Sequence, residues 1–165
     1  MARILVTAAT GRVGSALTQR LVAASHEVLA VTSRPEATEK LKETGAIPVV
    51  ADLHRPETLQ QSAEGVDAVF LATPDHPSQD ALERSLITQF ATAGTPHIVK
   101  LSAQSAGLDP PVSFGALHRR SEQALEASGL PYTILRAGFK SYSNVTIPCE
   151  TPRHEPDACY ERPRG

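Results

Sequence analysis

The N-terminal residues combine a short apolar run, a glycine-bearing turn and the start of a helical pattern. Residues 2–7 read ARILVT, residues 8–14 follow as AATGRVG, and the helical pattern begins directly after them. A turn of this kind lets the backbone approach a pyrophosphate, and the free N–H groups and positive dipole end of the helix then bind the anion. The feature therefore predicts a strand, a phosphate-binding turn and a helix.

The glycine spacing of this turn is GxxGxxG with alanine at the first position. Gly11 and Gly14 allow close backbone approach and close packing of the helix on the strand, whereas Ala8 resists the positive φ of a tight turn. The strand before and the helix after support a cofactor site over the alternative, a purely structural turn. The residues expected in this cofactor-binding turn are Thr7, Thr10, Gly11, Arg12, Val13 and Gly14.

Six apolar runs alternate with helical patterns along the first 146 residues. The expected strands are residues 4–7, 27–32, 47–51, 67–72, 97–101 and 132–135, and the expected helices are residues 13–24, 35–43, 55–63, 78–93 and 114–128. Strands that alternate with helices predict an α/β fold with a doubly wound parallel sheet of about six strands, the Rossmann fold.

The composition changes at about residue 147. Residues 147–165 contain four of the 13 prolines and both cysteines, and they show neither strand nor helix periodicity. We expect a dinucleotide-binding domain at residues 1–146 and a disordered tail at residues 147–165. The abrupt change also suggests a truncated or out-of-frame end.

Composition argues against several other classes of protein. The net charge is −2 with no basic tract, which argues against direct nucleic-acid binding. No apolar run approaches the roughly 20 residues that span a membrane, so no membrane association is expected. Because both cysteines lie in the tail, a disulfide scaffold is not expected and a cytoplasmic location is. Cys149, His154 and Cys159 lack the paired spacing of a metal site, so no metal is expected.

The end of the second expected strand bears on cofactor choice. An acidic residue at this position would bind the ribose hydroxyls of NAD, but the sequence has Ser33 and Arg34. A hydroxyl and a guanidinium suit a 2′-phosphate, which predicts a preference for NADP(H) over NAD(H). The alternative is that Arg34 is simply a solvated residue before a proline.

Six segments in order resemble the NmrA-like family, a branch of the atypical short-chain dehydrogenase/reductase superfamily. They read ILVTAATGRVG at 4–14, VTSRP at 31–35, AD at 51–52, LATP at 71–74, VKLS at 99–102 and ASGLPYTILRAG at 127–138. The resemblance covers residues 1–146, and nothing here corresponds to the family's smaller C-terminal substrate region.

The resemblance implies further cofactor contacts. It places Asp52 against the adenine amino group and Leu53 against the adenine ring, although Asp52 is equally compatible with an exposed helix cap. It also implies contact between the nicotinamide ribose and the segment Ala72, Thr73 and Pro74, where the fourth expected strand ends.

The catalytic residues of the superfamily are only partly present. A serine after the fifth strand is found as Ser102, but the YxxxK pair is replaced by Phe114 and His118. Because phenylalanine has no proton to donate, the ordinary carbonyl-reductase mechanism is not available. Ser102 and His118 are the candidate catalytic residues, with His118 as an acid or a ribose contact. A surface helix histidine is the alternative for His118, and a strand-edge or snorkelling side chain is expected for Lys100.

Three functions are compatible with these residues. The first is hydride transfer from NADPH to a quinone- or azo-type acceptor, which needs little acid catalysis. The second is a non-catalytic NADP(H) redox sensor that acts through a regulatory protein. The third is a truncated remnant with little activity. The expected partner is therefore a small-molecule acceptor or a regulatory protein.

Overall fold

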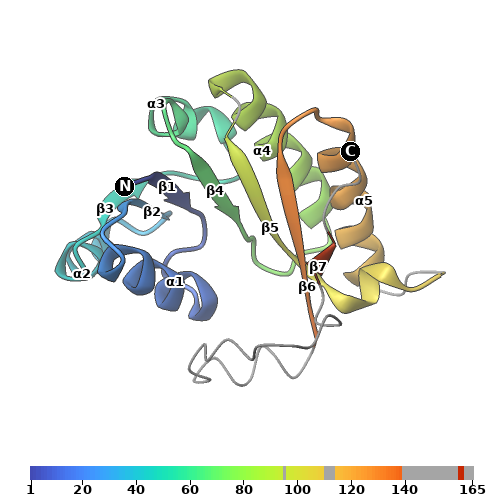
Figure 1. Ribbon diagram of the computed structural model, residues 1–165, viewed down its shortest axis with the longest axis horizontal. Coiled ribbons are helices and arrows are strands. Elements are labelled where there is room, and N and C mark those ends of the chain that lie inside the picture. Colours follow the sequence, from blue (N-terminus) through green and yellow to red (C-terminus); the bar gives the residue numbers. More distant parts are fainter. Residues whose placement is uncertain (95, 110–113, 139–159, 162–165) are drawn as a thin grey trace.

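A sheet with helices on both faces forms the centre of the molecule (Figure 1). The computed structural model describes residues 1–94, 96–109, 114–138 and 160–161. The strands are β1 (Arg3–Val6), β2 (Glu27–Thr32), β3 (Ile47–Val50), β4 (Ala68–Leu71), β5 (His97–Ala103), β6 (Tyr132–Ala137) and β7 (Tyr160–Glu161). Their order in the sheet is β3-β2-β1-β4-β5-β6-β7. The pairings among β1 to β6 are all parallel, and β7 pairs antiparallel with β6.

The helices divide between the two faces of the sheet. The α-helices are α1 (Arg12–Ala23), α2 (Thr38–Glu43), α3 (Gln60–Ala63), α4 (Gln79–Ala93) and α5 (Phe114–Ala127), and the 3-10 helices are η1 (Pro35–Ala37), η2 (Pro56–Leu59) and η3 (Gln104–Gly107). Buried residues of α3, α4 and α5 belong to one apolar cluster. Residues of α1 and α2 belong to a second.

Successive residues of a strand pack alternately in the two apolar clusters, one on each face of the sheet. In β4, Val69 and Leu71 pack in the first cluster and Phe70 in the second. A parallel sheet covered on both faces requires such strands to be apolar throughout, which explains the continuous run AVFL. The predicted doubly wound parallel sheet is thereby confirmed.

The strand order indicates where a ligand-binding crevice lies. β1 pairs with β2 on one side and β4 on the other, so the order of the strands reverses between β1 and β4. The helix after β1 lies in one cluster and the helix after β4 in the other. Ligands of open α/β sheets bind at this switch point, beyond the carboxyl ends of the strands.

The observed boundaries differ from the predicted ones in identifiable ways. Each of the six predicted strands is present, with ends shifted by two residues or fewer. Two predicted helices begin as 3-10 turns at Pro35 and Pro56, and η3 was not predicted. Residues 160–161 of the predicted disordered tail form β7, and the rest of that segment lies outside the described residues. Among the helices of the described residues, none is long and apolar enough to cross a membrane.

Candidate functional site

The turn between β1 and α1 has an unusual backbone. Ala8 adopts a φ of +49°, in the left-handed region that the sequence argument expected alanine to resist. The Gly11 N–H donates to the Ala8 carbonyl oxygen at 2.9 Å, which closes the turn. Holding a non-glycine residue there costs about 1–2 kcal/mol, and such strain clusters at ligand sites.

Gly14 is required by the close approach of the α1 helix to this turn. A Cβ on Gly14 would lie 2.2 Å from the Ala8 carbonyl oxygen, and one on Gly11 would lie 3.1 Å from the same atom. Gly11 caps α1 without a side-chain hydrogen bond. Since the first N–H groups of a helix have no intrahelical partner, this end of α1 fits a phosphate.

A cavity of about 270 Å³ lies beside the turn. It collects residues that follow four different strands, as expected at the switch point of the sheet. Six residues predicted to contact the cofactor line it, namely Thr10, Gly11, Ser33, Arg34, Leu53 and Pro74. The cavity therefore brings together the turn, the end of β2 and the loops after β3 and β4.

A second cavity of about 160 Å³ lies between α1 and α2 and shares Thr10 and Arg34 with the first. Lys40 of α2 also lines it, which adds a second cationic side chain that the sequence argument missed. Thr18 lines the same cavity and is 1% exposed, and its Oγ1 atom has no hydrogen-bond partner among the described residues. A buried hydroxyl of this kind calls for a further polar partner.

Thr7, Arg12 and Val13, which were also predicted to bind the cofactor, line neither of the two cavities. Thr7 is fully buried, and its Oγ1 lies 2.6 Å from the Ala72 carbonyl oxygen and accepts from the Ala72 N–H at 2.8 Å. This contact fastens the end of β1 to the end of β4. Arg12 and Val13 lie in the first turn of α1.

Asp52 makes local contacts. Its Oδ1 accepts from the His54 N–H at 3.0 Å, and its Oδ2 lies 3.6 Å from Arg55 Nε. The side chain lines neither cavity, in contrast to Leu53. The hydrogen bond from His54 closes a local turn, and η2, whose N-cap residue is Arg55, has no side-chain cap hydrogen bond, so Asp52 does not cap this helix.

Ser102 lies in a buried polar network. It is fully buried in β5, and its Oγ donates to Glu122 Oε1 at 2.5 Å. Arg136 donates to both oxygens of the same carboxylate, at 3.1 and 2.9 Å. Burial acts to raise the pKa of Glu122, but the hydrogen bonds from Arg136 and Ser102 outweigh it and lower the pKa. Ser102 thus links β5 to α5.

The structure corrects the expectations for Lys100 and His118. Lys100 is on an interior strand and fully buried, where it forms an ion pair with Glu83 of α4, so it is neither at a strand edge nor snorkelling. His118 is 5% exposed, so the surface-histidine alternative is wrong. Its Nδ1 lies 3.5 Å from Lys100 Nζ. Phe114, by contrast, is 49% exposed at the start of α5.

The pKa values of His118 and Glu83 are both lowered. Burial lowers the pKa of His118 below 6.5, and the charge of Lys100 lowers it further against the opposing charges of Glu83, Asp75 and Glu122. Burial acts to raise the pKa of Glu83, but Lys100 and a hydrogen bond from Thr73 lower it overall. His118 is therefore a neutral imidazole at pH 7.

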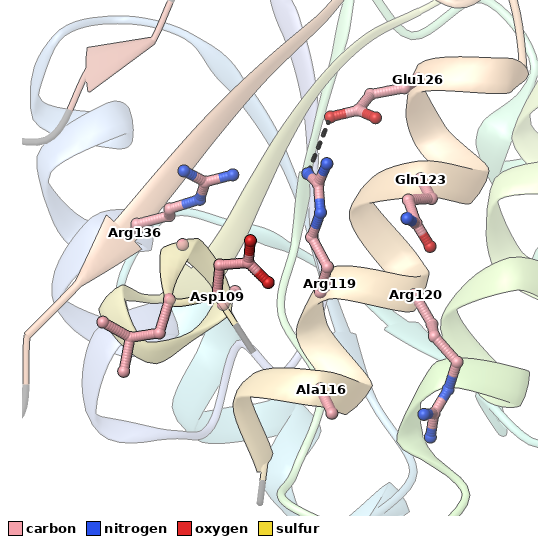
Figure 2. Close-up of a pocket in the computed structure, with 10 residues that line it drawn as sticks. Asp109, Ala116, Arg119, Arg120, Gln123, Glu126 and Arg136 are labelled. Atoms are coloured by element: carbon pink, nitrogen blue, oxygen red, sulfur yellow. Dashed lines mark hydrogen bonds and ion pairs between the residues drawn. The ribbon is translucent and has the colours of Figure 1, made fainter. Parts of the chain in front are cut away.

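Another cavity, of about 700 Å³, lies away from the β1–α1 turn (Figure 2). Arg119 and Arg120 of α5 and Arg136 of β6 line it. Each arginine has an acidic partner, which is Glu126 and Glu122 for Arg119, Asp80 for Arg120 and Glu122 for Arg136. Sequence reasoning did not find this cavity, because η3 and residues far apart in the chain form it.

The fold and the cleft together define a dinucleotide-binding α/β domain. A family model described as NAD(P)H-binding matches residues 8–155. The chain belongs to this NAD(P)H-binding family, and the resemblance to NmrA-like proteins of the atypical short-chain dehydrogenase/reductase superfamily is confirmed.

Individual relatives agree with this assignment. The chain is 33% identical to an NAD(P)H azoreductase of Xenophilus azovorans over 82% of this chain and 48% of the relative. It is similar to the triphenylmethane reductase of Citrobacter sp. complexed with NADP(H), with a TM-score of 0.71 and 27% identity over 81% of this chain and 48% of that one. It is also similar to the quinone oxidoreductase QOR2 of Escherichia coli complexed with NADPH, with a TM-score of 0.72 and 25% identity over 81% and 48%. The chain thus spans about half the length of these relatives.

Proposed function

We propose that this chain binds NADP(H) in preference to NAD(H) and that the protein to which it belongs transfers hydride from NADPH to a quinone- or azo-type acceptor. The observation that carries the proposal is the cavity of about 270 Å³ beside the strained β1–α1 turn, which collects Gly11, Arg34 and Leu53. The azoreductase, dye reductase and quinone oxidoreductase among the similar proteins support the acceptor class.

The preference for NADP(H) rests on two cationic side chains. Arg34 lines both the larger cofactor cavity and the smaller one between α1 and α2, and Lys40 lines the smaller one. A 2′-phosphate on the adenosine ribose is a dianion that a guanidinium binds through charge-assisted hydrogen bonds. The unpartnered Thr18 hydroxyl offers one more polar contact in the same cavity.

Different segments of the chain would bind different parts of the cofactor. The turn at Thr10–Gly14 would hold the pyrophosphate through backbone N–H groups and the dipole of α1. Leu53 would pack against the adenine, and the segment Ala72–Pro74 would lie beside the nicotinamide ribose. When bound, NADPH supplies the hydride. His118, neutral at pH 7, could donate only a hydrogen bond there rather than act as an imidazolium acid.

A redox sensor remains the second candidate. Phe114 has no proton to donate, and the Ser102 hydroxyl is already engaged by Glu122. A chain that binds NADP(H) without turnover would act on a regulatory protein partner. Retained NADPH binding with no oxidation of NADPH in the presence of quinones or azo dyes would favour this candidate.

The contribution of the two cations can be tested by calorimetric titration of variants. We expect Arg34→Ala to weaken NADPH binding by about 10- to 100-fold, since a hydrogen bond to a charged group contributes about 1.5–3 kcal/mol. Lys40→Ala should weaken it less, because a single lysine contact is a point charge. NADH binding should change little in both variants.

Matched controls are available on α1 and α2. Arg20→Ala on α1 and Lys42→Ala on α2 remove exposed cations that line neither cavity. Both controls should bind NADPH as the unchanged chain does. Equal weakening of NADPH and NADH in Arg34→Ala would contradict 2′-phosphate recognition.

A further inference from the structure

Three titratable side chains from three elements meet in the core beside the cofactor cleft. Glu83 comes from α4, Lys100 from β5 and His118 from α5. Glu83 and Lys100 have 0% exposed side chains and form an ion pair, and Lys100 Nζ lies 3.5 Å from His118 Nδ1. Burying an ion pair is costly, and a fold in which apolar residues of similar volume replace the pair is often as stable. Stability of the fold alone therefore does not explain this cluster.

The cluster is connected to the loop that follows β4. Thr73 Oγ1 donates to Glu83 Oε1 at 2.7 Å, and Gln79 Nε2 donates to the same oxygen at 3.2 Å. Asp75, in the same loop, is close enough to His118 for its charge to affect the pKa of the imidazole. The cluster thus lies at the carboxyl edge of the sheet, where ligands of this fold bind.

The contact between Lys100 and His118 determines which imidazole nitrogen carries the proton. An ammonium group has three donors and no acceptor, so the Nδ1 atom that faces it must be the unprotonated acceptor. In a neutral imidazole the proton is then on Nε2. Within the part of the chain that the structure describes, Nε2 donates to no protein group, and the side chain keeps 5% of its surface exposed.

We propose that Lys100, held in place by Glu83, is a positioning residue that fixes His118 as the neutral tautomer with its proton on Nε2. His118 thereby offers a hydrogen-bond donor to an oxygen or nitrogen of the bound acceptor. This role rests on the proposed function, because it concerns the same site. Burial, the charge of Lys100 and the opposing charges of Glu83, Asp75 and Glu122 together leave the pKa of His118 lowered, which agrees with a neutral ring.

The tautomer can be measured without any cofactor. Two-bond ¹H–¹⁵N correlation spectra of the ¹⁵N-labelled chain report which ring nitrogen is protonated, and His118→Gln assigns the signals. We expect one tautomer with Nε2 protonated. His97, whose Nε2 lies 2.9 Å from Thr133 Oγ1, is the internal control. A ring protonated on Nδ1 would overturn the proposal.

Two variants test the role of the lysine. Lys100→Met removes the donor but leaves Glu83 buried without its partner, so the double variant Glu83→Gln/Lys100→Met removes both charges together. In a folded variant of either kind we expect a mixture of the two His118 tautomers, with the His97 signals unchanged. A His118 spectrum identical to that of the unchanged chain would overturn the positioning role.

Kinetics separates this inference from the proposed function. If the chain turns over a quinone, His118→Gln should lower kcat while the affinity for NADPH stays within twofold. Unchanged kcat would overturn the donor role of His118 while leaving the proposed function intact. Absence of NADPH binding in the unchanged chain would contradict the proposed function, and the NMR result would still decide the tautomer.

Discussion

Replacement of Ser102 by alanine is expected to destabilise the fold while leaving cofactor binding nearly unchanged. The Ser102 hydroxyl is fully buried and donates to Glu122 Oε1 at 2.5 Å. The same carboxylate accepts two further hydrogen bonds from Arg136. Ser102 lines neither cavity beside the β1–α1 turn. The geometry therefore predicts a mainly structural role for this serine.

The size of the effect follows from the contacts of the carboxylate. A hydrogen bond to a charged group contributes about 1.5–3 kcal/mol. Because Arg136 Nε still donates to Oε1 at 3.1 Å in the variant, the oxygen is not left without a partner. We therefore expect a loss near the lower end of that range, about 1.5–2 kcal/mol in the free energy of unfolding.

Urea unfolding followed by circular dichroism measures this loss. With a slope of about 2 kcal/mol/M, a loss of about 2 kcal/mol lowers the unfolding midpoint by about 1 M. Ser15→Ala is the control, since Ser15 makes only an exposed hydrogen bond to the Arg12 carbonyl oxygen at 3.3 Å, and it should change stability by less than about 0.5 kcal/mol. Equal midpoints for Ser102→Ala and the control would show that the buried hydrogen bond of Ser102 does not stabilise the fold.

Three further substitutions have defined expectations. Gly14→Ala should lower the free energy of unfolding by about 1–3 kcal/mol and weaken NADPH binding, because the added Cβ would lie 2.2 Å from the Ala8 carbonyl oxygen. An unchanged urea midpoint together with an unchanged NADPH affinity in calorimetry would contradict this. Ala8→Gly should stabilise by about 0.5–1 kcal/mol, since relief of the +49° φ, about 1–2 kcal/mol, exceeds the entropic cost of glycine, about 0.4–1 kcal/mol; a lowered Tm would argue otherwise. Burial and the Lys100 charge lower the pKa of His118 in the folded chain below 6.5. As the pH drops through 6.5, His118 is therefore protonated in the unfolded chain before it is in the folded chain, and the free energy of unfolding falls until the pH reaches the folded pKa. His118→Gln should reduce the dependence of the urea unfolding midpoint on pH across that interval. An unchanged dependence would exclude His118 as the cause of the loss of stability.

Local patterns were sufficient to predict most of the fold. Apolar runs located the six parallel strands of the described residues, because a strand covered on both faces must be apolar. Proline at 35 and 56 marked helix starts, but the pattern did not reveal that both begin as 3-10 turns. η3 was missed because the segment QSAG has no helical periodicity and is held by packing against α5.

More of the residues expected to bind the cofactor than of the expected catalytic residues lie together in one cavity. Thr10, Gly11, Ser33, Arg34, Leu53 and Pro74 are close to the ends of successive strands, and parallel strands bring such ends together. Lys40 was missed because it lies on a helix, six residues beyond Arg34, and lines the smaller cavity only through the packing of α2 against α1.

The environments of Lys100 and His118 depend on tertiary contacts. Sequence alone gave no indication that Glu83, 17 residues earlier on α4, pairs with Lys100 in the core. A charged residue within a strand is usually assigned to an edge, and only the position of β5 between β4 and β6 excludes that here. The same contacts bury His118, which a helical pattern beside two arginines had suggested could be exposed.

Calorimetric titration of the purified chain with NADPH and, in parallel, with NADH tests the central claim most directly. We expect NADPH binding about 10- to 100-fold tighter than NADH binding, because the contact of Arg34 with a 2′-phosphate is worth about 1.5–3 kcal/mol. Binding of neither nucleotide by a chain that circular dichroism shows to be folded would contradict the account.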